Sequence, residues 1–179
     1  MLCNGCTRSR QSVTSATPTP AIPLSADSSA LQRVSGAALA GQTILAGQTI
    51  YVPAYSHIYY HDRQSVINLT VTLSIRNADP THPIWVDHVA YYNATGALVR
   101  TDLAEPQQLA PLASLEFIVE EDDTTGGSGA SFLVKWSSAT SVVDPVVEAV
   151  MISAASTQGI SFTSVGRVIE EIPALPPEN

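Results

Sequence analysis

The strongest pattern in the chain is a strict alternation of apolar and polar residues between positions 67 and 75. Asparagine, threonine or serine separates the apolar residues, which are Ile67, Leu69, Val71, Leu73 and Ile75. A period of two places the apolar side chains on one face of a β-strand and the polar ones on the other. The alternation therefore predicts a half-buried strand of an antiparallel sheet, followed by a turn at Asn77, Asp79 and Pro80.

Further runs of β-branched, aliphatic and aromatic residues predict the rest of the fold. They cover residues 48–60, with a break at Pro53, and residues 84–92, 98–100, 115–121, 132–136, 146–153 and 160–169. About seven to nine short strands separated by turn signals predict an all-β domain, an antiparallel β-sandwich of immunoglobulin-like type. A small β-barrel is the second interpretation. Residues 29–40 are the only candidate helix.

Residues 113–136 combine more unusual features than any other segment. Apolar residues at 115–119 lead into four consecutive acids, a glycine-rich stretch and a second apolar run at 132–136. The acids are Glu120, Glu121, Asp122 and Asp123. We predict a β-hairpin in which the second run pairs with the first. If the chain has a functional site, we expect it in this segment.

Charge excludes one class of partner. Lys135 is the only lysine, and the formal net charge is −8 at pH 7. A nucleic-acid-binding surface needs a basic face to neutralise phosphates, so we expect no nucleic-acid partner. No apolar run reaches the ~18 residues of a membrane helix, which leaves a lipid anchor as the only expected membrane contact.

The N-terminal part has the composition of a tether. Residues 7–31 are rich in serine, threonine, alanine and proline, and both cysteines, Cys3 and Cys6, precede them. Such a segment buries too little apolar surface to fold, so we expect residues 1–45 to be a disordered leash. Residues 46–170 are then the β-sandwich domain, and residues 171–179 a loose proline-rich tail.

Cys6 is the candidate lipidation site, because it follows a small residue and directly precedes the serine-, threonine- and proline-rich residues 7–31. This arrangement is typical of bacterial lipoproteins and predicts a cell-envelope location, periplasmic or lipid-anchored. Against it, the chain shows no basic and apolar signal region before Cys6, and Cys3 stands where such signals usually have leucine.

Four stretches, in order, resemble the uncharacterised bacterial family named domain of unknown function 3124. They are residues 51–59 (YVPAYSHIY), 69–77 (LTVTLSIRN), 119–130 (VEEDDTTGGSGA), and 148–152 (EAVMI) followed by 158–162 (QGISF). The resemblance covers residues 49–169, the whole predicted domain. It implies an exported or lipid-anchored bacterial protein, and it carries over no activity and no catalytic residue.

Two groups of residues are candidate metal ligands. Glu120, Asp122 and Asp123 offer the oxygen ligands that Ca²⁺ prefers, although neighbouring residues of a strand point to opposite faces. The alternative is a solvated hairpin end whose charges discourage aggregation. His57, His61 and His88 are candidate ligands for Zn²⁺. On one strand, His57 and His61 would lie about 13 Å apart, so the fold would have to bend between them.

The tyrosines are candidates for partner binding, because each combines a rigid apolar ring with a polar tip. We single out Tyr55, Tyr59 and Tyr60, and we expect one residue of each adjacent tyrosine pair to face the core. Ser128 joins this group as a residue of the glycine-rich loop. The sequence around Ser128 falls one residue short of a nucleophile elbow, and a loop between two strands is the wrong context for one.

These features predict a non-enzymatic accessory domain of the cell envelope, which presents loops or a sheet face to a protein or glycan partner. The alternative is a metal-binding sandwich that uses the acidic loop or the histidines for Ca²⁺ or Zn²⁺. A hydrolase is a remote third hypothesis. We expect no organic cofactor.

Overall fold

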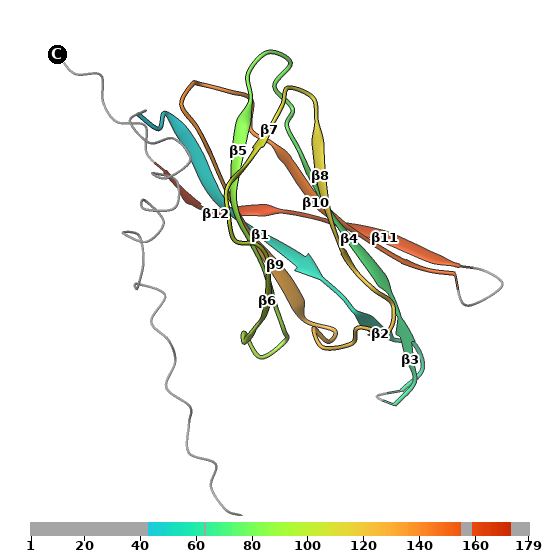
Figure 1. The fold of residues 1–179 in the computed structure, drawn as a ribbon. Helices are drawn as coiled ribbons and strands as arrows, with labels where there is room; N and C mark the ends of the chain where they lie inside the picture. Colours follow the sequence, from blue (N-terminus) through green and yellow to red (C-terminus); the bar gives the residue numbers. More distant parts are fainter. Residues whose placement is uncertain (1–42, 63, 155–158, 173–179) are drawn as a thin grey trace, which may run out of the picture.

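The computed structural model describes residues 43–62, 64–154 and 159–172, in which every regular element is a β-strand (Figure 1). All strand pairs are antiparallel, so the predicted fold class is confirmed. The described residues form twelve strands, more than predicted, because some predicted runs are divided and because the strand at Gln107–Leu109 lies outside every predicted run. The candidate helix at 29–40 and almost all of the proposed leash lie outside the described residues. Within the described part, no helix is long and apolar enough to span a membrane.

The larger sheet has six strands, in the order β12-β1-β9-β5-β6, with β7 also paired to β5. Its strands are β1 (Ala46–Ala54), β5 (Ile84–Tyr92), β6 (Leu98–Leu103), β7 (Gln107–Leu109), β9 (Ala130–Ser138) and β12 (Arg167–Glu171). The second sheet has the order β11-β10-β4-β8. Its strands are β4 (Thr70–Arg76), β8 (Ser114–Val119), β10 (Val146–Ser153) and β11 (Ile160–Val165). A small separate sheet pairs β2 (His57–Tyr59) with β3 (Val66–Asn68).

One apolar core joins the two large sheets. The first sheet contributes Val52, Val134 and Trp136, and the second contributes Leu73 and Met151, all of them fully buried in one cluster. Two antiparallel sheets that bury their inner faces against each other form a β-sandwich. Burying each large apolar side chain contributes about 1.5–3 kcal/mol to stability, so this shared core supplies most of the stabilisation of the fold.

The alternation at residues 67–75 faces the core as predicted. Val71, Leu73 and Ile75 are fully buried, while Thr70 and Thr72 point outward and are partly exposed. The predicted strand is nevertheless divided at Leu69. The Leu69 amide donates a hydrogen bond to the Ser56 carbonyl at 2.9 Å, so β3 ends before it and β4 begins after it.

The predicted hairpin at residues 113–136 is wrong. Strand β8 pairs with β4 in the four-stranded sheet, whereas β9 pairs with β1 and β5 in the other sheet. Residues 120–129 therefore form a crossing loop between the two layers (Figure 1). The physical reason is the burial of β9, in which seven of nine residues are buried. A central strand of this kind pairs with one strand on each side, and its sequence pattern does not identify those two strands.

The predicted strand at 160–169 also belongs to both sheets. Strand β11 pairs with β10 in one sheet, and β12 pairs with β1 in the other. The change of sheet occurs at Gly166, whose amide donates to the Val147 carbonyl at 2.8 Å. A Cβ atom there would lie 2.6 Å from Ile50 Cγ2 and 2.9 Å from Val147 O. Only glycine allows the chain to pass this close to both sheets.

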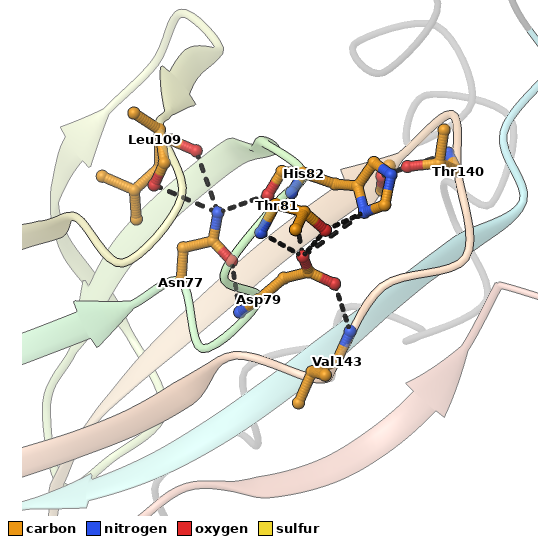
Figure 2. Close-up of polar contacts among 9 residues, drawn as sticks. Asn77, Asp79, Thr81, His82, Leu109, Thr140 and Val143 are labelled. Carbon is orange, nitrogen blue, oxygen red and sulfur yellow. Dashed lines mark hydrogen bonds and ion pairs between the residues drawn. The ribbon is translucent and has the colours of Figure 1, made fainter.

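Asn77 and Asp79 hold three sheet-crossing loops together (Figure 2). They lie in the β4–β5 loop, and the Asn77 side-chain amide donates to the carbonyls of Leu109 (3.2 Å) and Ala110 (3.1 Å) in the β7–β8 loop. The Oδ2 atom of the Asp79 carboxylate accepts a hydrogen bond from the Val143 amide in the β9–β10 loop at 3.1 Å. The predicted turn is therefore confirmed, and it is also a junction.

Asp79 is held as a carboxylate. Its Oδ1 atom accepts hydrogen bonds from the amides of Thr81 and His82, both at 2.8 Å, and from the Thr81 hydroxyl at 3.0 Å (Figure 2). These bonds lower the pKa of Asp79 well below its ordinary value of 3.8, and the bond from the Thr81 amide has the largest effect. The side chain stabilises the fold in its charged form only.

We predict that Asp79 makes stability depend on acid pH. Because its pKa is lower in the folded state, its stabilisation is present above pH ~4 and is lost as the pH falls below that value. The Asp79→Asn variant should lose much of this acid dependence and unfold more easily at neutral pH, where its amide would face the Val143 N–H. Urea unfolding at a series of pH values measures both effects. Asp122→Asn, a change at an exposed acid in the β8–β9 loop, is the control, and superimposable pH profiles of Asp79→Asn and the parent chain would contradict the prediction.

Candidate functional site

The β2–β3 hairpin carries the most exposed aromatic residues of the described chain. Its strands pair Ile58 with Ile67 and Tyr59 with Val66. Ile58 and Ile67 pack against the core, and this contact fixes the hairpin to the sandwich. Because side chains alternate along a strand, Tyr59 and Val66 point the other way. Tyr59 is 53% exposed, Tyr60 65% and Val66 43%.

The exposed ring of Tyr59 contacts a neighbouring side chain. The rings of His57 and Tyr59 meet edge to face, with centroids 5.4 Å apart. In the turn, Asp62 Oδ1 accepts hydrogen bonds from the amides of Gln64 (2.8 Å) and Ser65 (2.6 Å). These bonds lower the pKa of Asp62, and the bond from the Gln64 amide has the largest effect. The turn is therefore stabilised by a charged carboxylate. The described residues of the hairpin are thus joined by a ring contact and by hydrogen bonds to the Asp62 carboxylate.

The predicted division of tyrosine pairs between core and surface holds for one pair and fails for the other. Tyr91 is fully buried beside the partly exposed Tyr92, as expected, but Tyr59 and Tyr60 are both exposed. The reason is that the hairpin tip extends beyond the core, so both faces of the strand meet solvent there. Tyr55 packs edge to face on Phe162, with centroids 5.8 Å apart. It lies at the rim of the core and away from the exposed tip.

The candidate histidines lie on different elements. His57 is on β2 and His61 is in the exposed turn after it, while His88 lies half-buried on β5. Burial first, and then the charge of Lys135, lower the pKa of His88. In the part of the chain that the structure describes, no three histidine, cysteine, aspartate or glutamate residues come together in a way that could hold a metal ion.

The acidic loop is divided by its contacts with the protein. Asp123 forms an ion pair with Arg100 of β6, with Oδ2 2.8 Å from Nη1. Glu121 accepts a hydrogen bond from the Ser153 hydroxyl of β10 at 3.2 Å. Glu120, Glu121 and Asp122 are exposed, and Asp123 is partly buried. Two of the four acids therefore contact the sandwich, and one of these two, Glu121, is also open to solvent.

Arg100 is the centre of a polar cluster that the sequence analysis missed. Besides Asp123, its guanidinium contacts Asp102 at 2.6 Å and lies 5.0 Å from the centre of the Tyr91 ring. Burial, followed by the charge of Asp123, raises the pKa of Tyr91 to about 12, so this hydroxyl stays neutral. The spacing of Arg100 and Asp102 on one strand puts both side chains on the same face, which is the signal that could have revealed part of the cluster.

The glycine-rich stretch fastens the same loop from its other end. The Gly127 carbonyl accepts hydrogen bonds from the amide and hydroxyl of Ser56, at 3.1 and 3.2 Å. The Ala94 amide donates to the Gly126 carbonyl at 2.9 Å. A Cβ atom on Gly126 would lie 1.8 Å from the Tyr91 hydroxyl, so a larger residue cannot fit. Ser128 is half-buried in this packed turn.

Sequence comparison now places the chain. Residues 47–169 match the family described as "Protein of unknown function (DUF3124)". The chain belongs to this family. The match extends from β1 into β12 and confirms the resemblance noted in the sequence.

DUF3124 carries no activity in its description, and no protein with a curated description matches this chain. The structure described as "Crystal Structure of Thermotoga maritima 1070" resembles this DUF3124 chain over 67% of its length and 92% of its own, at 12% identity and a TM-score of 0.42.

We predict that Arg100 and Asp123 are energetically coupled in the DUF3124 domain. Replacing Arg100 by glutamine leaves the partly buried Asp102 and Asp123 without their cation, so the free energy of unfolding should fall by about 1–3 kcal/mol, between the values for surface and buried ion pairs. A double-mutant cycle with Asp123→Asn, followed by urea unfolding, should give a coupling of roughly 0.5 kcal/mol or more. Strict additivity of the two changes would contradict the coupling. Arg76→Gln, in the more exposed Arg76–Glu148 pair at 3.5 Å, is the matched control and should cost less.

Proposed function

We propose that this chain is a non-enzymatic accessory domain of the bacterial cell envelope, an immunoglobulin-like sandwich that binds a protein or glycan partner through its β2–β3 hairpin. The exposed pair Tyr59 and Tyr60 carries the proposal. Large aromatic side chains gain most from burial when a partner covers them, and tyrosine adds a hydroxyl that hydrogen-bonds at the rim of a contact.

The construction of the hairpin supports this role. Ile58 and Ile67 hold it to the core, the Asp62 turn orders its end, and the His57 ring orders Tyr59. A contact surface that is ordered before binding loses less conformational entropy when the partner arrives. In the acidic and glycine-rich loop, Asp123, Glu121 and the carbonyls of Gly126 and Gly127 are engaged in holding the sandwich together, which favours the hairpin as the binding surface.

We predict that replacing Tyr59 and Tyr60 together by alanine weakens partner binding at least ~10-fold, equivalent to ~1.4 kcal/mol. Two probes separate the partner classes. Co-sedimentation with purified cell-wall glycan tests a sugar partner, and a photo-crosslinking amino acid at position 60 in envelope extracts tests a protein partner, which is then purified and titrated.

Controls make this test specific. Tyr51→Ala, at a tyrosine 38% exposed on β1 of the large sheet, should leave binding unchanged. Tyr60→Phe should retain the contribution of the ring and lose only that of the hydroxyl. An equal loss with Tyr51→Ala, or equal crosslinking from position 51, would argue against a hairpin contact.

The envelope location leads to a separate prediction about Cys6, which lies outside the described residues. When the gene is expressed from its own locus, Cys6 should incorporate a clickable fatty acid and the protein should partition with membranes. Cys6→Ser should abolish both, because a thioether-linked lipid needs the cysteine sulfur. Cys3→Ser is the matched control and should leave both unchanged. Equal labelling of the Cys6→Ser protein would contradict attachment at this residue.

A further inference from the structure

Strand β11 is an edge strand without the charged residues that protect the other long edges. Charges on an edge strand discourage pairing with another chain. Strand β6 carries Arg100 and Asp102, and β8 carries Glu116 and receives a hydrogen bond from Arg100 at the Ile118 carbonyl (3.2 Å). Strand β12 carries Arg167, Glu170 and Glu171. The β11 sequence, Ile-Ser-Phe-Thr-Ser-Val, contains no charge and no proline, and its pairing with β10 has no bulge.

The backbone groups on the open edge of β11 can be identified residue by residue. The Gly166 amide bonds to the Val147 carbonyl, so Gly166 and Val147 form a hydrogen-bonded pair. Such pairs alternate along an antiparallel ladder, and the register then places Ile160, Phe162 and Ser164 in bonded pairs with β10. The backbone N–H and C=O groups of the residues between them point away from β10. These residues are Ser161, Thr163 and Val165, whose side chains are exposed.

We propose that β11 pairs antiparallel with β11 of a second copy of this chain, joining two four-stranded sheets across a two-fold axis. This is a different surface from the β2–β3 hairpin, and it goes beyond the proposed binding function. In the joined sheet, the core-facing sides of both copies lie on the same face only if each residue pairs with a residue of the same parity. The two paired residue numbers must therefore be both odd or both even. Centring the axis on Thr163 pairs it with itself and pairs Ser161 with Val165. In that register every outward-facing backbone group of the three residues gains a partner.

The side chains of β11 favour a second copy as the occupant. In the Thr163-centred register, threonine lies beside threonine, and serine lies beside valine or phenylalanine. None of these contacts places like charges together, and threonine pairs stabilise antiparallel strands. The nearest acid on the neighbouring strand, Glu148, is already paired with Arg76 at 3.5 Å. A second β11 therefore meets a neutral edge in spite of the net charge of the chain.

The strand is also held ready for pairing. Phe162 packs on Tyr55 from the inner face, and the Ser164 hydroxyl donates to the Pro53 carbonyl. Figure 1 shows β10 and β11 extending past the body of the sandwich, and among the strands that the structure describes only β10 pairs with β11. Beside it, Ile152 of β10 is 47% exposed on the outer face. The partner strand would cover part of this apolar surface.

The first test is the mass of the full-length protein, measured by sedimentation velocity over a wide concentration series. We expect a reversible dimer that strengthens with added salt, since screening weakens repulsion between two acidic copies. Thr163→Lys places two lysines opposite each other and should raise the dimer dissociation constant ~10-fold or more. Thr163→Val retains the backbone and the shape of the side chain, and it should still dimerise. Thr72→Lys, on the outer face of β4 away from the edge, is the charge control and should also dimerise.

The second test fixes the register by disulfide crosslinking in a Cys3→Ser, Cys6→Ser background. Hydrogen-bonded strand partners have Cα atoms about 5.5 Å apart, within the range that a disulfide spans. Thr163→Cys should crosslink rapidly to itself, whereas Ser161→Cys faces Val165 and should not. A monomer at all concentrations, a dimer unaffected by Thr163→Lys, or faster crosslinking at 161 than at 163 would each overturn the proposal. Circular dichroism of each variant confirms that the domain remains folded.

Discussion

The sandwich depends on hydrogen bonds that join the loops crossing between its two sheets. At one end, Asn77 and Asp79 connect the β4–β5, β7–β8 and β9–β10 loops. At the other, Gly126 and Gly127 connect the β8–β9 loop to Ser56 and Ala94. An apolar core favours burial but has no direction, so these directional bonds determine how the two layers are closed at their ends.

Chemically distinctive residues of this chain are used mainly for architecture. The acids of residues 120–123 and the glycines after them suggest a reactive or metal-binding loop when taken in sequence order. In the fold, Asp123 neutralises Arg100 and Gly126 makes room for Tyr91. A buried polar group destabilises a protein unless it has a partner, and in this loop the partners come from the same chain.

The sequence allowed the all-β class and the inward-facing residues of β4 to be predicted, because both follow from local alternation. The pairing of strands could not be predicted in the same way. Residues 115–119 and 132–136 show the alternation of hairpin partners, yet the burial of β9 on both faces assigns them to different sheets. Tyr59 and Tyr60 were recognised as candidates by residue type, but their shared exposure follows from how far the hairpin extends past the core.

The passage of the chain through Gly166 has a mechanical consequence. One continuous segment is hydrogen-bonded to β10 in one layer and to β1 in the other, with a single residue between the two ladders. Sliding one sheet over the other would have to break backbone bonds in at least one of the two ladders. The two layers therefore resist shear as one body, and a pull applied to either outer surface is transmitted to the whole sandwich.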